Sequence, residues 1–209
     1  MMGRTIGSAR RIQDILDVPS VYALFRRLFG LDQFLQDLVD NEIKPSPGSR
    51  ILDIGCGNGD LYKFLGDVDY VGIDSNRDCI TRANSQFGTN ATFLYADLAH
   101  FDITTLGTFD HIVGVGILHH IDDEACKQLF SLMRETLNEN GSAITADPCF
   151  HPQQQLLNRF IVSIDRGQYV RHYDAYRYLA ENAFTVSEMK LIDGLFPLPH
   201  SVALMKLSV

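Results

Sequence analysis

Short apolar runs recur through the middle of the chain, and polar or glycine-rich turns separate them. The runs occupy residues 51–54, 70–74, 91–98, 109–118 and 142–148. The run 109–118 is mostly apolar without regular alternation, which is typical of a parallel strand covered on both faces. The runs therefore predict five strands of this kind, each with a turn at its carboxyl end.

Apolar residues at helical spacing lie between the runs and predict helices there. After the first, second and fourth runs these residues are Leu61, Phe64 and Leu65; Ile80 and Ala83; and Leu129, Met133 and Leu137. Gly88 is expected to end the second of these helices, and Asn140-Gly141 the third. The alternation of strand and helix predicts an α/β fold with a doubly wound, Rossmann-like sheet.

The segments on either side of this middle differ from it. Residues 12–43 have apolar residues at helical spacing, interrupted at Gly30, and predict helices. We expect them to form a helical cap that can cover a ligand, with helices that only pack as the alternative. Residues 184–192 and 201–207 predict two final strands, which complete a sheet of seven.

We expect a single domain over the whole length of the chain, because 209 residues are too few for two comfortable cores. Its expected parts are an N-terminal helical cap at 1–48, a cofactor-binding core at 49–148, and a substrate-side insertion with the final strands at 149–209.

A glycine-rich turn follows the first run, in the sequence Asp53-Ile54-Gly55-Cys56-Gly57-Asn58-Gly59-Asp60. Its spacing is G-x-G-x-G, and Asp60 stands where the dinucleotide pattern would need a third glycine. Such a turn brings backbone N–H groups close to a nucleotide-like ligand. The carboxylate of Asp53 opposes a diphosphate and suits a cationic ligand. A turn that uses glycine for its geometry alone is the alternative.

Acidic residues also close the second and third runs. Asp74 lies 19 residues after Gly55, close to the spacing at which a carboxylate binds ribose hydroxyls in doubly wound folds. Asp97 occupies the corresponding place after the third run. A helix cap for Asp74 and a solvated loop carboxylate for Asp97 are the alternatives.

Together these elements resemble the class I S-adenosylmethionine-dependent methyltransferases over about residues 49–148. The glycine-rich turn is similar to motif I of that family, and Ile117-Leu118-His119-His120 is similar to its motif after the fourth strand. The resemblance implies S-adenosylmethionine as cofactor, an antiparallel last strand, and an adenine site at Asp97 and Leu98. The implied cofactor-binding residues are Asp53, Gly55, Cys56, Gly57, Gly59, Asp74, Ser75, Asp97, Leu98 and Val115.

Transfer of a methyl group to a hydroxyl needs a base that removes the proton as the methyl arrives. His119 and His120 are the candidate bases, because histidine titrates near neutral pH and both follow the fourth run. Successive side chains of an extended chain point to opposite sides, so we expect one of the two, His119, to face the acceptor. Histidines held by hydrogen bonds near the site are the alternative.

The acceptor is expected to meet residues from both ends of the chain. The candidates are Tyr22, His151, Arg166, Tyr169 and Arg171. Arginine suits an anionic group on the acceptor, and an ion-paired or solvated arginine is the alternative.

Composition narrows the class of partner. The net charge of −8 argues against nucleic acid. No apolar run approaches 18 residues, so we expect no membrane partner. The four cysteines stand far apart without a C-x-x-C pair, which favours neither metal nor disulfides and fits a cytoplasmic location.

We therefore predict a methyltransferase that acts on a small-molecule acceptor at oxygen, as a monomer or a homodimer. Carbon and nitrogen acceptors remain open. A nucleotide-binding module or an NAD-dependent oxidoreductase on the same fold is the alternative, and Asp60 argues against it.

Overall fold

The computed structural model describes residues 30–98, 100–165, 167–193 and 198–208. The strands are β1 (Arg50–Ile54), β2 (Asp69–Asp74), β3 (Thr92–Tyr95), β4 (Phe109–Val115), β5 (Leu137–Phe150), β6 (Arg171–His172), β7 (Thr185–Asp193) and β8 (Ser201–Ser208). The α-helices are α3 (Leu31–Leu38), α4 (Arg77–Phe87), α5 (Asp123–Thr136), α6 (Leu156–Ser163) and α7 (Tyr173–Ala180). A π-helix, η1 (Val39–Ile43), follows α3, and the 3₁₀ helices are η2 (Leu61–Phe64), η3 (Ile103–Leu106) and η4 (Leu118–His120).

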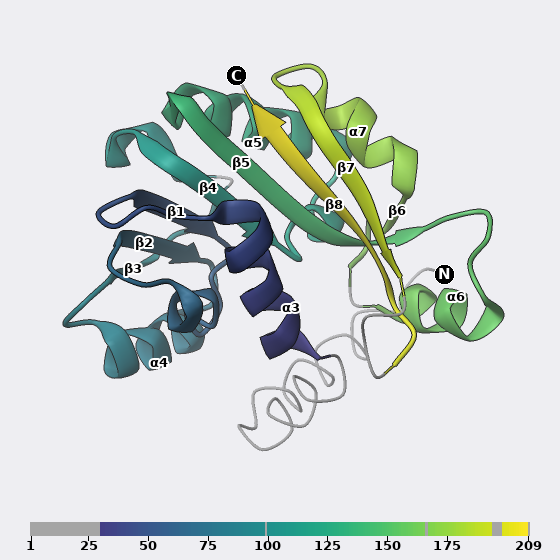
Figure 1. Ribbon diagram of the computed structural model, residues 1–209, viewed down its shortest axis with the longest axis horizontal. Coiled ribbons are helices and arrows are strands. Elements are labelled where there is room, and N and C mark those ends of the chain that lie inside the picture. Colours follow the sequence, from purple (N-terminus) through teal and green to yellow (C-terminus); the bar gives the residue numbers. More distant parts are fainter. Residues whose placement is uncertain (1–29, 99, 166, 194–197, 209) are drawn as a thin grey trace, which may run out of the picture.

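One sheet runs through the molecule in the order β3-β2-β1-β4-β5-β8-β7 (Figure 1). Strands β1 to β5 pair in parallel, and β8 runs antiparallel to both β5 and β7. The predicted doubly wound α/β sheet and its antiparallel last strand are confirmed. The two-residue strand β6, which pairs in parallel with the end of β5, adds an eighth strand that the sequence did not predict.

Helices cover both faces of this sheet, which explains why the middle strands are apolar without alternation. Ile112 of β4 is packed in the cluster that includes α5 and α7, and its neighbour Val113 is packed in the cluster that includes α3 and α4. Both side chains have no exposed surface. In Figure 1, α3 crosses one face of the sheet. The core therefore consists of two layers, with the sheet between them.

The boundary between α5 and β5 lies earlier in the chain than the pattern predicts. Leu137 was expected on the helix and Asn140-Gly141 at its end, but α5 ends at Thr136 and all of these residues belong to β5. Leu137 pairs with Phe109 of β4. A Cβ added to Gly141 would lie 2.8 Å from the carbonyl oxygen of Asp110, so this glycine allows two strands to approach closely and does not stop a helix.

The helix predicted after the glycine-rich turn is also shorter than expected. The spacing of Leu61, Phe64 and Leu65 gives only the 3₁₀ helix η2, and Leu65 is already extended. Leu61 and Leu65 are still buried, in the layer that contains α3. The pattern therefore predicts the buried residues correctly but not the length of the helix.

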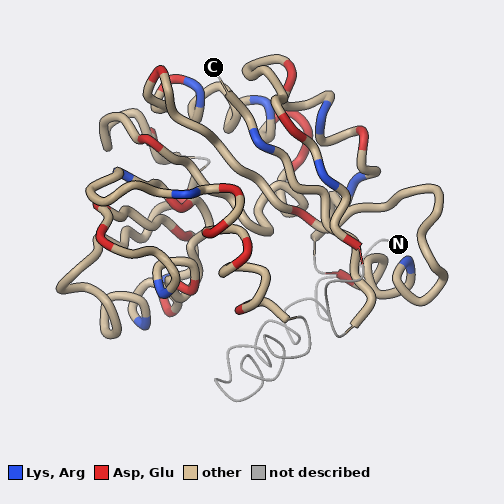
Figure 2. The backbone as a smooth tube through the Cα atoms, in the orientation of Figure 1, with Lys and Arg blue, Asp and Glu red and all other residues tan. Residues whose placement is uncertain are grey.

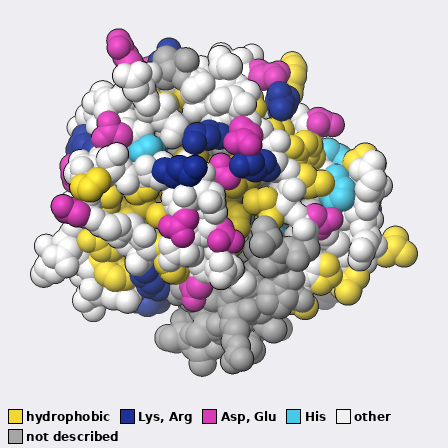
Figure 3. Space-filling view, viewed as in Figure 1, with side chains coloured by type: hydrophobic (Ala, Val, Ile, Leu, Met, Phe, Trp, Pro, Cys, Tyr) yellow, Lys and Arg dark blue, Asp and Glu magenta, His cyan; other side chains and the backbone are white. Residues whose placement is uncertain are grey.

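The described part of the expected N-terminal cap packs against the sheet. Gly30 adopts a φ of 57° before α3, which agrees with the predicted break at this glycine. Within η1, the carboxylate of Glu42 lies 2.7 Å from Nζ of Lys190 on β7, and the Glu42 carbonyl accepts from Lys206 on β8. Basic positions on β7 and β8 lie beside acidic ones (Figure 2), and Lys and Arg side chains gather next to Asp and Glu on the face in Figure 3. Whether this cap covers a ligand stays a prediction.

Ile112 allows a test of the two-layer core. We expect Ile112→Ala to lower the free energy of unfolding by about 2–5 kcal/mol, because the cavity cannot collapse between two packed layers. Urea denaturation followed by circular dichroism measures this. The matched control is Ile164→Ala, because Ile164 is 63% exposed and its truncation should change stability little. A loss below 1 kcal/mol, on the scale of a surface change, for Ile112→Ala would contradict this packing.

Candidate functional site

The glycine-rich turn after β1 has a backbone that only glycine adopts without strain. Gly55, Gly57 and Gly59 have φ values of 77°, 53° and 75°. The N–H groups of Gly55 and Cys56 both donate to the carbonyl of Ile73, at 2.8 and 3.1 Å. The turn is therefore fixed to the end of the neighbouring strand β2.

The three glycines differ in what surrounds them. A Cβ added to Gly55 would lie 3.0 Å from the Ile117 side chain, and one added to Gly59 would lie 2.8 Å from Phe93. A Cβ added to Gly57 would meet no described residue within 4 Å. The backbone at Gly57 therefore borders open space, which fits a cofactor that approaches the turn closely.

Asp74 at the end of β2 supports this turn directly. Its Oδ2 accepts the N–H of Gly57 at 2.9 Å, and its Oδ1 accepts the N–H of Asn76 at 2.7 Å. Asn76 in turn caps α4, as its side chain accepts from the N–H groups of Asp78 and Cys79. Asp74 stays partly exposed, next to exposed Ser75. Since each carboxylate oxygen can accept a second hydrogen bond, Asp74 can still receive ligand hydroxyls.

Asp53 and Cys56 lie beneath the turn. Asp53 is buried, and its Oδ2 accepts the hydroxyl of Tyr70 at 2.6 Å. Burial raises the pKa of Asp53 to about 7, although the Tyr70 hydrogen bond opposes the shift. Burial also raises the pKa of the Cys56 thiol. A Cβ added to Gly72 would lie 2.8 Å from Cys56 Sγ, so this thiol is packed against β2.

The remaining predicted cofactor residues lie at the same edge of the sheet. Asp97 follows β3 and is exposed, with its carboxylate 3.2 Å from Nδ1 of His100. Leu98 beside it and Val115, the last residue of β4, are half-buried. The structure thus brings the predicted residues to the carboxyl ends of β1, β2, β3 and β4, where doubly wound sheets bind ligands.

The two candidate bases lie on the helix η4, so the expectation of an extended chain there is wrong. His119 is buried, and its Nδ1 lies 2.8 Å from Oδ1 of Asp147. Its Nε2 lies 3.2 Å from Oδ1 of Asp165. His120 is exposed, and its ring centre lies 4.0 Å from that of His119. The two rings therefore lie side by side instead of on opposite sides of a strand.

Asp147 and Asp165 were not predicted as site residues. Asp147 on β5 is 1% exposed, and its Oδ1 also accepts the backbone N–H of His119 at 3.1 Å. Its Oδ2 has no hydrogen-bond partner among the described residues. A signal for Asp147 exists in the sequence, since it closes the fifth run as Asp74 and Asp97 close the second and third. For Asp165 we find no comparable signal.

The predicted acceptor-binding residues fall into different places. Tyr169 is 39% exposed, and its N–H donates to the carbonyl of His119 at 2.9 Å. Arg171 is buried and bonds to other parts of the chain. His151 is also buried, with Nε2 at 3.2 Å from the hydroxyl of Ser201. Tyr22 and Arg166 lie outside the described residues.

Among the residues that the structure describes, no group of three or more His, Cys, Asp or Glu side chains could hold a metal ion. In the same part of the chain, no helix is long and apolar enough to cross a membrane.

The chain resembles known proteins in both its sequence and its fold. A family model described as "Methyltransferase domain" matches residues 51–141. The cyclopropane-fatty-acyl-phospholipid synthase of Escherichia coli K12 is 28% identical over 50% of this chain, but over only 27% of its own length. Phosphoethanolamine N-methyltransferase 3 of Arabidopsis thaliana is 29% identical over 66% of this chain and 29% of its own length. The chain thus spans less than a third of these curated relatives.

A solved structure extends the likeness in fold to nearly the whole chain. The TehB-like SAM-dependent methyltransferase of Corynebacterium glutamicum has a TM-score of 0.63 and 18% sequence identity. The likeness covers 98% of this chain and 99% of that one. At this identity it is a likeness in fold.

Asp74 offers a test of the cofactor site. We expect Asp74→Ala to weaken the binding of S-adenosylhomocysteine by about 1–3 kcal/mol, the scale of a lost charge-assisted hydrogen bond. Isothermal titration calorimetry measures this. Asp78→Ala, at an exposed residue of α4, is the control and should keep the affinity. Unchanged affinity in folded Asp74→Ala would remove Asp74 from the ligand site.

Asp53 should make stability depend on pH. Because its folded-state pKa of about 7 lies above that of an unfolded aspartate, the folded chain holds a proton there that the unfolded chain has lost. The free energy of unfolding should therefore fall as pH rises from about 4 to 7, by at most about 1.4 kcal/mol per unit.

Denaturation at a series of pH values measures this slope. Asp53→Asn should flatten the slope between pH 5 and 7, because the amide still accepts from Tyr70 but does not titrate. This pH window follows from the raised pKa of Asp53. Asp78→Asn should keep the slope. If Asp53→Asn shows the same slope as the unaltered chain, Asp53 is not the titrating group.

Proposed function

Since the chain belongs to the class I S-adenosylmethionine-dependent methyltransferase family, we propose that it transfers a methyl group to a hydroxyl of a small molecule. The predicted family and its cofactor are confirmed by the match to the methyltransferase domain and by the methyltransferase fold. These findings do not support the alternative of an NAD-dependent oxidoreductase. The activity of the whole protein and its acceptor remain part of the proposal.

The observation that carries the proposal is the position of His119. It lies on the turn after β4, and the glycine-rich turn lies after the adjacent strand β1. Ile117 connects the two turns, because its side chain is the nearest neighbour of a Cβ built on Gly55. A group that can accept a proton is thus next to the predicted cofactor site.

When bound, S-adenosylmethionine supplies a methyl group on a positively charged sulfur, which an acceptor oxygen displaces in line. Asp147 accepts a hydrogen bond from Nδ1 of His119 and fixes the ring, so that Nε2 is the nitrogen that takes the acceptor's proton. Oδ1 of Asp165 lies 3.2 Å from Nε2, in the place of an acceptor hydroxyl. The Asp165 side chain is 25% exposed, and we propose that it moves aside when the acceptor binds.

The cofactor end of the site is assigned to the residues around the glycine-rich turn. We propose that Asp74 receives the ribose hydroxyls and that Asp97 and Leu98 line the adenine, as the family resemblance implies. Asp53 lies buried beneath the turn, where burial favours its protonated form and a bound cationic ligand would favour its ionised form. The backbone at Gly57 borders the open space and forms the contact surface.

The names of the relatives refer to different classes of molecule and therefore do not identify the methyl acceptor. The Escherichia coli relative is named for a lipid product and the Arabidopsis relative for an amine. We favour a hydroxyl because an oxygen acceptor needs the base that His119 and Asp147 provide, whereas a neutral amine can attack without one. The net charge of −8 supports a small molecule over nucleic acid. A cytoplasmic location and a monomer or homodimer belong to the same proposal.

His119 allows the proposal to be tested. A screen with labelled methyl donor across hydroxylated and carboxylated metabolites identifies an acceptor first. His119→Asn should then lower kcat by about 10²–10⁴-fold, since the amide can still bond to Asp147 but cannot take a proton. The loss should shrink as pH rises, because hydroxide or an ionised acceptor replaces the base. Affinity for S-adenosylhomocysteine should change little.

His120→Ala is the matched control, because His120 is adjacent but exposed. If His120→Ala loses the activity and His119→Asn keeps it, the base is His120 and the assignment to His119 is wrong. Near-normal kcat in both variants at neutral pH would show that the acceptor loses its proton without either histidine.

A further inference from the structure

We propose that Arg171 is a positioning residue, which together with Asp123 clamps the backbone of residues 118–121 and so sets the place of His119. We call residues 118–121 the histidine turn, and Arg171 with Asp123 the clamp. The functional part of this inference rests on the proposed role of His119 in methyl transfer. The sequence left two uses of Arg171 open, a grip for an anionic acceptor and an ion-paired or solvated side chain.

The guanidinium of Arg171 uses all of its donors inside the protein. An arginine side chain carries five N–H groups. Nε and Nη2 each lie 2.8 Å from Oδ1 of Asp123, and Nη2 also donates to the carbonyl of Ile121 at 2.8 Å. Nη1 donates to the carbonyls of Leu118 and Tyr169, at 2.7 and 3.1 Å. Two of these acceptors are the first and last carbonyls of the histidine turn.

Burial makes these contacts necessary for Arg171. Its side chain is 8% exposed, and a buried guanidinium without partners would be strongly unfavourable. Burial alone would lower its pKa, but the hydrogen bond to Asp123 and other neighbours hold the pKa above the ordinary value. An acceptor anion could reach the guanidinium only by replacing one of these partners. The geometry therefore favours positioning over acceptor binding.

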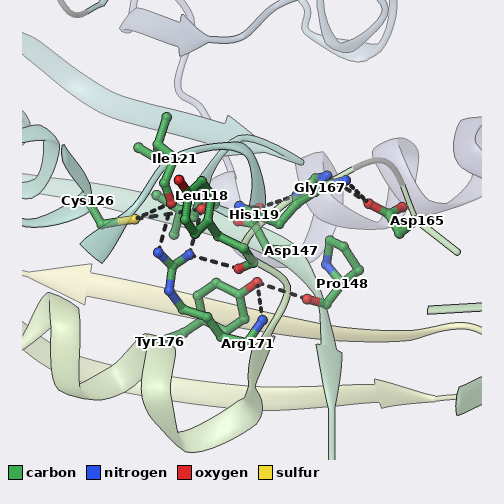
Figure 4. A network of polar contacts seen from close by, with 11 residues as sticks. Leu118, His119, Ile121, Cys126, Asp147, Pro148, Asp165, Gly167, Arg171 and Tyr176 are labelled. Carbon is green, nitrogen blue, oxygen red and sulfur yellow. Dashed lines mark hydrogen bonds and ion pairs between the residues drawn. The ribbon is translucent and has the colours of Figure 1, made fainter. Parts of the chain in front are cut away.

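The segment that leads to Arg171 contacts His119 from further sides (Figure 4). The N–H of Tyr169 donates to the His119 carbonyl, and Asp165 lies next to Nε2. A Cβ added to Gly167 would lie 2.0 Å from Cδ2 of the His119 ring, so the backbone of Gly167 is packed directly on the imidazole. The ring is thus in contact with Asp165, Gly167 and Asp147.

The histidine turn has little regular structure to hold it otherwise. The helix η4 is three residues long. Apart from the clamp, its Leu118 carbonyl accepts from the N–H of Ile121 at 3.4 Å and from Sγ of Cys126 at 3.7 Å. Asp123 lies in the first turn of α5. The clamp therefore links the start of α5, the histidine turn and the strand β6 through one side chain.

The test uses the full chain and the reagent diethyl pyrocarbonate, which acylates accessible, unprotonated imidazole nitrogens. The rate at each histidine is read by peptide mass spectrometry, with His100, which is 83% exposed and lies outside the histidine turn, as the internal standard. In the unaltered chain His119 should react much more slowly than His100. Arg171→Lys offers three donors instead of five and should raise the rate at His119 relative to His100 by about tenfold, as expected when a charge-assisted hydrogen bond is lost.

Two further variants make the result specific. Asp123→Asn, at a side chain that is 70% exposed, should shift the rate in the same direction and serves if Arg171→Lys does not fold. Asp122→Ala removes the side-chain cap of α5 without touching Arg171, and should lower the melting temperature without changing the rate at His119.

An unchanged rate at His119 in a folded clamp variant would overturn the inference. An equal rise in Asp122→Ala would also overturn it, since the effect would then be a general loosening of α5. Calorimetry with S-adenosylhomocysteine accompanies each variant and should give the affinity of the unaltered chain. If the unaltered chain fails to bind this ligand, the proposed function fails while the clamp can still be judged from the rates.

Discussion

The site depends on hydrogen bonds that run from the turn after one strand to the end of a neighbouring strand. The turn after β1 donates to Ile73 and Asp74 of β2, and the turn after β3 donates from Ala96 to the Asp74 carbonyl. The turn after β4 donates from Gly116 to Ala146 and from His119 to Asp147. Because parallel strands end at the same edge, each strand end can hold the turn beside it. The sheet thereby fixes the positions of loops that have little regular structure of their own.

The sequence predicted most of the residues at this edge of the sheet, because the patterns that identify them lie within short stretches of the chain. An apolar run that ends in an acid or glycine identifies both a strand and the group at its carboxyl end, as for Asp74. The direct contact of Asp74 with Gly57 follows from the pairing of β1 and β2, which a doubly wound topology implies. The site residues that follow β1, β2, β3 and β4 were therefore within reach of sequence reasoning.

The partners of His119 could not be predicted from the sequence, because they come from distant parts of the chain. Asp147 lies 28 positions away and Arg171 is 53 positions from Leu118, the residue whose carbonyl it binds. No periodicity relates such residues, and an arginine that grips an acceptor has the same sequence signal as one that grips a carbonyl. The 3₁₀ turn at His119 was missed for a similar reason, since its partners Asp147 and Tyr169 lie outside the turn. Likewise, Gly141 was misread because its role is to let β4 approach.

Gly167 places a limit on how this protein can vary in evolution. With no side chain it fits against the imidazole of His119, and even a methyl group would overlap the ring. Its restriction comes from both the ring and the backbone of His119, because a Cβ at 167 would also lie 2.5 Å from the His119 carbonyl oxygen, and its own backbone is not among those with positive φ. A smaller side chain at 119 would not make room for one at 167, because the carbonyl oxygen of residue 119 would remain. Related chains that keep this approach of the two backbones should therefore keep glycine at 167 even where residue 119, 48 positions away, changes.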